Sequence, residues 1–283
     1  MASPINLFSY CRIIVINVKS NFMKNLINWK LFFVLLAACV ISSMLVIPYS
    51  LALTSNDIKI TPLILLLSAV QNLVLFAAAA FFGLLLSKQI GMGLPVLQNA
   101  IEGKNQAKEN KTSARIKSLL IPSIGLGVLA GLAIVLLSIP FNRSIPELSL
   151  LDVSIPAWKA FLASIYGGIA EEVLLRLFLV SLFVWITFKI KKGKEGKPAV
   201  FGIWLSIILS AIIFGLGHLP ATAQILPLTE IVIIRAIVLN GIGGMIFGWL
   251  YWKKGLESAI IAHFSADIVL HVISPFIASV FSF

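Results

Sequence analysis

The sequence predicts an all-α membrane protein, a bundle of helices that crosses a bilayer several times. Of its 283 residues, 59% are hydrophobic and only 12% are charged, and mean hydropathy is +1.04, so a soluble domain would lack polar surface. Apolar runs of about 20 residues recur, each long enough to cross a hydrocarbon core roughly 30 Å thick. The runs are continuous rather than alternating, which favours helices over the strands of a barrel.

Seven spans are expected along the chain. They are placed at 31–53, 60–87, 118–139, 160–188, 199–218, 230–251 and 257–282. Pro275 interrupts the last run, so this run is either one span or a span followed by a short second segment, which would make eight. Residues 31–139 thus form a unit of three spans with a basic loop, predicted to be cytoplasmic.

Residues 1–30 form a leader that we expect to be amphipathic and to lie on the membrane. The leader contains Arg12, Lys19, Lys24 and Lys30 and no acidic residue. The apolar run that follows has about 23 residues, which exceeds the 7–15 of a signal-peptide core, so we expect it to be a retained span. Two cysteines, Cys11 and Cys39, do not make a disulfide framework.

Two connections and the fourth apolar run allow further predictions. Residues 88–117 are predicted to form a surface helix, GLPVLQNAIEG, followed by a flexible loop, KNQAKENKTSAR. The segment 140–158 contains three prolines and is expected to lie along the outer interface. From Trp158 to Lys189 the chain is longer than one crossing needs, so part of it should tilt or run along the interface before the glutamates.

The basic residues indicate the orientation, because cytoplasmic loops of membrane proteins are rich in Lys and Arg. They concentrate in the leader and in the connections after the second, fourth and sixth spans. The N-terminus is therefore predicted to be cytoplasmic and the C-terminus outside, in the plasma membrane of a bacterium or archaeon. Since the net charge of +11 comes from these loops, we expect no nucleic-acid partner.

Three charged residues lie inside the fourth apolar run. The run GGIAEEVLLRLFLV contains Glu171, Glu172 and Arg176. A charge within a bilayer costs about 3 kcal/mol on insertion scales, so such residues indicate a functional site. Residues four apart share a helix face, and neighbours are about 100° apart. Glu172 should therefore pair with Arg176, which leaves Glu171 available as a general base.

All three histidines lie in the C-terminal third of the chain. His218 ends the fifth span in FGLGH, with Phe214 one turn before it. His263 lies early in the last span in HFSAD, with Asp267 one turn later on the same face and His271 beyond it. By the predicted topology, His218 is near the outer end of its span and His263 near the inner end. Helices that start late, tilt or break would be needed to bring them level.

Three motifs in this order resemble a known family. EEVLLR fits EExxxR, FGLGH fits FxxxH, and HFSAD fits HxxxN/D, each in an apolar helix. Together they resemble the CPBP family, the CAAX proteases and bacteriocin-processing enzymes also called ABI. The resemblance implies a polytopic helical bundle of the CAAX-protease type, with residues 155–283 as the catalytic domain.

The family resemblance implies an intramembrane endopeptidase that cuts near the C-terminus of a membrane-associated peptide or protein. By that resemblance, Glu171 and His218 activate a water, while His263 and Asp267 stabilise the oxyanion. Glu172, Arg176 and Phe214 support the site. Well-understood members have Asn at the last position, and Asp267 donates a hydrogen bond only when protonated. An ionised Asp267 that orients His263 is the alternative.

Metal-free activation of water by glutamate is favoured, with zinc or another divalent metal as the alternative. His218, His263 and Glu171 could supply the three ligands that a catalytic zinc needs. However, Glu172 is expected to pair with Arg176, so no carboxylate would remain as the base. His271 keeps a metal-binding HxxxDxxxH face open as a further alternative.

Two other functions compete with a peptidase. The first is a non-catalytic immunity, resistance or signalling scaffold of the same fold, which would have no need of buried Glu, His and Asp. The second is a proton-coupled transporter, which should show discontinuous helices in repeated halves. The expected partners are a peptide or small-protein substrate and membrane lipids.

Overall fold

Seven helices of the computed structural model are long and apolar enough to cross a membrane. The structure describes residues 26–53, 61–103, 109–150 and 155–281, with only the backbone described for 109–116, 149–150 and 279–281, so the leader lies almost wholly outside the described residues. Within these ranges there is no strand. The seven are α2–α3 (Trp29–Leu45, Ile47–Leu53), α4 (Pro62–Ile90), α6 (Glu109–Ser144), α7–α8 (Ala157–Tyr166, Ser181–Ile190), α9–α10 (Val200–Gly217, Leu219–Thr222), α11 (Glu230–Lys254) and α12–α13 (Leu256–Asp267, Ser274–Phe281).

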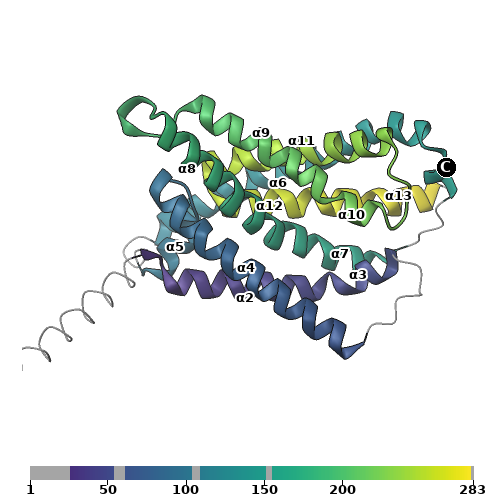
Figure 1. Cartoon of the computed structure of the whole chain (residues 1–283), viewed down its shortest axis with the longest axis horizontal. Helices are drawn as coiled ribbons and strands as arrows, with labels where there is room; N and C mark the ends of the chain where they lie inside the picture. The colour runs from purple at the N-terminus through teal and green to yellow at the C-terminus, as the bar shows by residue number, and fades with distance from the viewer. Residues whose placement is uncertain (1–25, 54–60, 104–108, 151–154, 282–283) are drawn as a thin grey trace, which may run out of the picture.

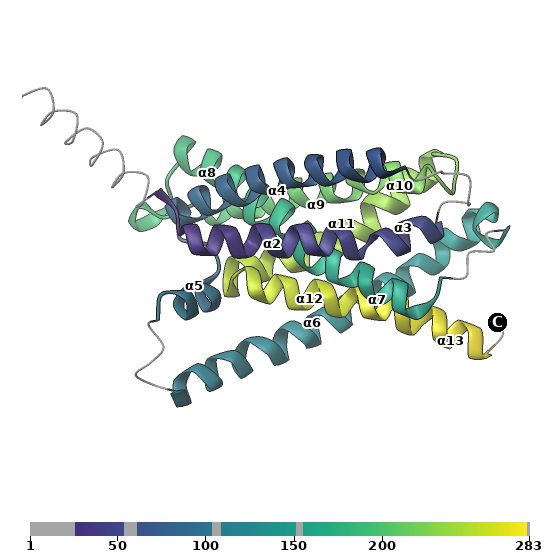
Figure 2. The same ribbon diagram turned by 90° about the horizontal axis from the view of Figure 1, so that it is seen from below.

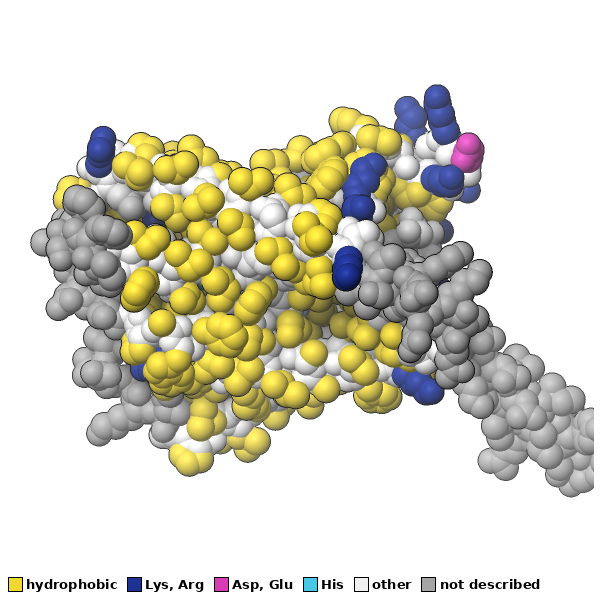
Figure 3. Space-filling view, turned by 180° about the vertical axis from the view of Figure 1, so that it is seen from behind, with side chains coloured by type: hydrophobic (Ala, Val, Ile, Leu, Met, Phe, Trp, Pro, Cys, Tyr) yellow, Lys and Arg dark blue, Asp and Glu magenta, His cyan; other side chains and the backbone are white. Residues whose placement is uncertain are grey.

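The seven spans run roughly parallel or antiparallel to one another (Figure 1). The α8–α9 connection and α5 (Pro95–Ile101) lie at one end of the bundle, and α3, α10 and α13 lie at the other. Figure 2 shows α6 along one edge, beside α12. Figure 3 shows hydrophobic side chains over the long face and Lys and Arg side chains near the two ends. This is the polytopic helical bundle that the composition predicts.

The helices approach closely where one of them presents glycine. Gly244 and Gly248 of α11 face α9, and a Cβ at Gly244 would lie 2.7 Å from that of Ala211. A Cβ at Gly248 would lie 2.8 Å from Cγ2 of Ile207. Such small residues four apart let membrane helices pack backbone to backbone, because apolar burial does not hold helices together within lipid.

Buried hydroxyl groups also connect the spans. The hydroxyls of Ser181 in α8 and Tyr251 in α11 are 2.7 Å apart, and those of Ser123 in α6 and Ser258 in α12 are 2.5 Å apart. Hydrogen bonds of this kind between membrane helices contribute about 0.6 kcal/mol each. They therefore fix the registers of the helices more than they stabilise the bundle.

The surface helix α5 is present as predicted and is attached to the start of α12. The Leu256 N–H donates to the Gly93 carbonyl at 2.9 Å. The carboxylate of Glu257 accepts hydrogen bonds from the backbone N–H groups of Val96 and Leu97, both at 2.9 Å. An acidic side chain at a helix N-terminus satisfies amides that lack partners within the helix. The connection between α4 and α5 is thereby joined to the span that carries His263.

Two predictions about the connections are wrong. The helix α6 begins at Glu109 and ends at Ser144, so the predicted loop is shorter and residues 140–144 continue the span through Pro140. Its first turns are rich in Lys, Glu, Ala and Arg, which favour helices. A proline within a membrane helix is tolerated because neighbouring groups satisfy the freed carbonyl.

The segment from Trp158 to Lys189, predicted to tilt or to run partly along the interface, does not break before the glutamates. Residues 157–190 form one continuous helical span of 34 residues. Its central turns are π-helical, in η2 (Gly167–Glu171) and η3 (Val173–Val180). A π-turn places more residues in each turn than an α-turn, so it takes up extra chain length without leaving the span. The last span is likewise continuous past Pro275, through the π-helical η5 (Ile268–Ile273).

Candidate active site

The two glutamates lie in the wide turns at the middle of the α7–α8 span. Glu171 ends η2, and Glu172 lies between η2 and η3. Single π-helical turns within α-helices occur frequently at functional sites, because they change the direction in which side chains leave the helix. Here the wide turns place two adjacent carboxylates against His263 of α12.

Glu172 is fully buried and its Oε1 atom has two partners. Nη1 of Arg176 is 2.7 Å away, which is the ion pair that the spacing predicts. Nδ1 of His263 is also 2.7 Å away and donates a hydrogen bond. The second contact was not predicted, since it joins residues 91 positions apart. Glu172 therefore balances the charge of Arg176 and also holds the ring of His263.

Arg176 is buried, and its guanidinium group contacts aromatic rings and a backbone carbonyl. Its guanidinium carbon lies 5.1 Å from the ring centre of Phe214 and 5.3 Å from that of Phe247. Its Nη2 atom donates to the carbonyl of Gly244 at 3.3 Å. The faces of two aromatic rings, a carbonyl and a carboxylate together replace the water that a buried cation loses. Phe214, which is part of the FxxxH motif, and Phe247, which is in none of the motifs, therefore both contact Arg176.

The ring of His263 is fixed by stacking and by its bond to Glu172. It lies on the ring of Phe247, with centres 4.6 Å apart and planes at 23°. Because Nδ1 donates to Glu172, the neutral ring carries its proton there and Nε2 is left to accept or bind a proton. Nε2 lies 3.7 Å from Oε2 of Glu171 and 3.6 Å from Oδ1 of Asp267. These three groups form a small polar centre.

Glu171 is the more accessible of the two glutamates. Its side chain is 22% exposed, whereas that of Glu172 is fully buried. The structure places His263, rather than His218, beside Glu171. The sequence predicts correctly that Glu172 pairs with Arg176 and that Glu171 does not. The neighbour of Glu171 depends on how the helices pack.

The ring of His218 contacts that of Phe214, which in turn contacts the ring of His263. The centres of these two rings are 4.7 Å apart, and the ring of Phe214 is 5.7 Å from that of His263. Phe214 therefore lies between the two histidines, and His218 is one helical turn beyond it. The Nδ1 atom of His218 is 2.8 Å from the carbonyl of Phe214, which can only accept, so its Nε2 is also free of a proton in the neutral ring.

Gly167 lets the span that carries the two glutamates lie close to the span that carries His263 and Asp267. A Cβ at this position would collide with Oδ2 of Asp267 and would lie 3.3 Å from Nε2 of His263. At the next residue, a Cβ on Gly168 would lie 3.1 Å from that of Phe264. The pair of glycines before the glutamates is a sequence signal for this contact, and the motifs did not include it.

His271 does not continue the face of His263 and Asp267 in a regular way. It lies in the π-helical η5, and its ring faces that of Tyr49 in α3, with centres 6.0 Å apart. Tyr49 belongs to the first span, in which no motif was recognised. Among the described residues, no group of three or more His, Cys, Asp or Glu side chains is arranged to hold a metal ion.

Taken together, the contacts place a partly exposed carboxylate, a fixed imidazole and a second carboxylate within one buried centre. Such a set can take a proton from a bound water and pass it to another group. It can also supply a hydrogen-bond donor to a developing oxyanion, through a protonated His263 or Asp267. These are the requirements for hydrolysis of an amide.

Comparison with protein families gives one match. Residues 153–269, less than half of the chain, match the family model described as type II CAAX prenyl endopeptidase Rce1-like. The matched segment contains all three motifs, and it confirms the resemblance that they carry. No curated protein and no solved structure matched the chain.

Proposed function

We propose that this protein is an intramembrane endopeptidase, because residues 153–269 match a model of the CAAX protease family, which implies a peptidase. It would hydrolyse a peptide bond near the C-terminus of a membrane-associated peptide or protein. The observation that carries the proposal is the fixed ring of His263, whose Nε2 lies 3.7 Å from Glu171 and 3.6 Å from Asp267.

In the proposed reaction, Glu171 takes a proton from a water, whose oxygen attacks the carbonyl carbon of the substrate. His218 assists this step, as the family resemblance implies, through its free Nε2. His263 and Asp267 stabilise the oxyanion of the tetrahedral intermediate, which requires one of them to donate a proton in a hydrogen bond. The C–N bond then breaks, and the proton held by Glu171 passes to the leaving amine.

Activation without a metal remains the favoured mechanism. Glu172 is paired with Arg176, so if Glu171 bound a metal, neither glutamate would remain as the base. Zinc or another divalent ion, held by Glu171, His218 and His263, stays the alternative, and no step of the proposed reaction uses it.

Substrate and location follow from the same proposal. A site at mid-span suits a substrate whose C-terminus is attached to or inserted in a membrane. The protein would act in the plasma membrane of a bacterium or archaeon, with the N-terminus cytoplasmic. A panel of membrane-tethered peptides is therefore the appropriate set of substrates.

The test is cleavage of that panel by purified protein in liposomes, with and without a chelator. We expect Glu171→Gln to lower kcat by about 10²- to 10⁴-fold, the usual contribution of a general base, without lowering Tm. His218→Ala should also lower kcat, and Glu147→Gln, at an exposed acid outside the spans, should not. Loss of activity with the chelator would establish the metal alternative.

Cleavage by Glu171→Gln at the rate of the unsubstituted protein would contradict the mechanism. If neither protein cleaves any peptide of a broad panel, the scaffold and transporter hypotheses gain. Proton flux into liposomes would then separate those two.

A further inference from the structure

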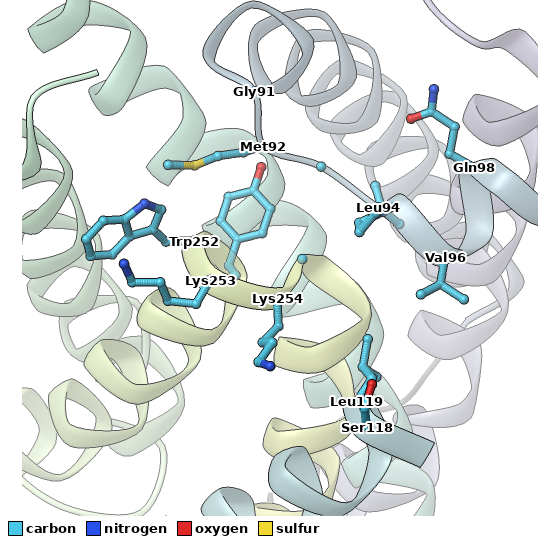
Figure 4. Close-up of a pocket in the computed structure, with 14 residues that line it drawn as sticks. Gly91, Met92, Leu94, Val96, Gln98, Ser118, Leu119, Trp252, Lys253 and Lys254 are labelled. Atoms are coloured by element: carbon cyan, nitrogen blue, oxygen red, sulfur yellow. The ribbon is translucent and has the colours of Figure 1, made fainter. Parts of the chain in front are cut away.

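A cavity of about 420 Å³ lies at the end of the bundle where α5 meets α11. Figure 4 shows its three walls. The connection that contains Gly91 and Met92 forms one wall, the last turn of α11 forms the second, and Ser118 with Leu119 of α6 forms the third. This volume lies within the range of small-molecule sites, roughly 300–1,000 Å³.

The cavity is basic. Lys253 and Lys254 line it, and no acidic side chain does. Neither lysine has a carboxylate within ion-pair distance among the residues that the structure describes. Nζ of Lys253 is 3.5 Å from the ring centre of Trp252, which also lines the cavity. Two ammonium groups are thus available to a ligand.

Glu257, the acidic residue closest in sequence to the two lysines, binds backbone N–H groups of α5. Glu257 lies three residues beyond Lys254 and accepts hydrogen bonds from the N–H groups of Val96 and Leu97. On the other side of the same α4–α5 connection, a second cavity of about 620 Å³ is lined by Lys30, Lys88 and Glu102. Of these two cavities, the one beside Lys253 and Lys254 has basic residues and no acidic residue in its lining.

The position and the lining indicate the kind of ligand. The cavity lies at the ends of membrane spans, the depth at which lipid headgroups are found. Its basic groups stand beside apolar ones, Met92, Leu119 and Trp252, which suit the glycerol and first carbons of a lipid. Basic pockets between membrane helices on the cytoplasmic side are known to bind anionic headgroups.

We propose that this cavity binds the phosphate of an anionic phospholipid, with Lys253 and Lys254 as its ligands. The site is separate from the candidate active site, and the proposal does not depend on peptidase activity. A bound headgroup would also touch Gly255, directly before α12, and would so hold the start of the span that carries His263.

The test is binding of short-chain phosphatidylglycerol to the purified full-length protein in detergent, measured by native mass spectrometry. We expect the double variant Lys253→Gln/Lys254→Gln to bind about 30-fold more weakly, since each lysine near an anionic headgroup contributes roughly a factor of five. The matched control is Lys191→Gln/Lys192→Gln, which removes the same charge from exposed residues of the α8–α9 connection. It should bind like the unsubstituted protein.

A second variant tests the cavity without a change in charge. Leu119→Trp should fill part of the space and weaken binding, with Tm in the absence of lipid unchanged. Equal losses in the two double variants would overturn the proposal in favour of diffuse surface charge. Undiminished binding by Leu119→Trp would also overturn it, as would competition by inorganic phosphate at the same concentration, because the site would then take a free anion.

Discussion

At the scale of single residues, Glu172 links structure and chemistry. One of its oxygens meets both Arg176 and His263, at 2.7 Å each. Removing one partner of a buried ion pair costs about 3–5 kcal/mol, because the other charge is left unpaired. Substitution of Glu172 would therefore mix loss of folding with loss of activity. Glu171 and Asp267 are partly exposed and are the better probes of the chemistry.

The role of Asp267 can be tested by exchange for asparagine. Because Nδ1 of His263 is held by Glu172, the ring does not need Asp267 to orient it. If Asp267 donates to the oxyanion, an amide can replace it, and Asp267→Asn should keep kcat within about 10-fold. Asp267→Ala should lower kcat by about 10²- to 10³-fold, the cost of one oxyanion donor.

The alternative role gives the opposite pattern. If ionised Asp267 acts as an acceptor for His263, then Asn should be nearly as harmful as Ala. Measuring kcat for both variants on one peptide, with Tm as the control for folding, separates the two roles.

The spacing of residues along one helix predicted part of this site. The pair of Glu172 and Arg176 follows from a separation of four residues. The contact of Glu172 with His263 crosses between spans, and it depends on where each helix begins and how the two are rotated. Sequence periodicity carries no information on these quantities, so the neighbours of Glu171 could not be predicted.

At the scale of helices, the contact between η2 and α12 depends on Gly167. Gly167→Ala would add a Cβ that collides with Asp267, and overpacking of this kind costs about 1–3 kcal/mol. We expect lower Tm and a loss of kcat, since the collision is with the candidate site itself. Gly125→Ala, in α6 with open space around it, is the control and should change neither. Normal activity of Gly167→Ala would show that the two spans are less closely packed.

The attachment of α5 to α12 gives a second prediction at this scale. Glu257→Ala removes the acceptor of two backbone hydrogen bonds, each worth about 1.5–3 kcal/mol when the acceptor is charged. Residues 95–101 should then exchange amide hydrogen faster, as measured by mass spectrometry. Glu147→Ala, which removes an exposed acid elsewhere, should leave that exchange unchanged. Equal exchange in both variants would mean that other contacts hold α5.

Positions of the spans were more predictable than their internal geometry. Apolar composition sets where a span begins and ends, and all seven were found within a few residues of the prediction. Composition does not distinguish an α-turn from a π-turn, so η2, η3 and η5 could not be predicted. The early start of α6 was missed because its first turns are polar, although they consist of helix-forming residues.

At the scale of the whole molecule, the distribution of Lys and Arg among the connections predicts the orientation in the membrane. In a background without Cys11 and Cys39, we expect Lys194→Cys to be protected from a membrane-impermeant maleimide in intact cells. Arg143→Cys should be labelled, because it lies after an odd number of predicted spans. Labelling of both, or of Lys194→Cys alone, would contradict the predicted topology.

The ion pair between Glu172 and Arg176 also bears on how the protein is made. Glu172 and Arg176 belong to one helix, so they can neutralise each other as that helix enters the bilayer during synthesis. Each charge alone would cost about 3 kcal/mol on insertion. His263 is synthesised 91 residues after Glu172 and reaches it only when the last span arrives. The fourth span can therefore enter the membrane with Glu172 and Arg176 already paired, which leaves Glu171 as the unpaired charge of the three, and its polar centre is completed only when the span that carries His263 is inserted.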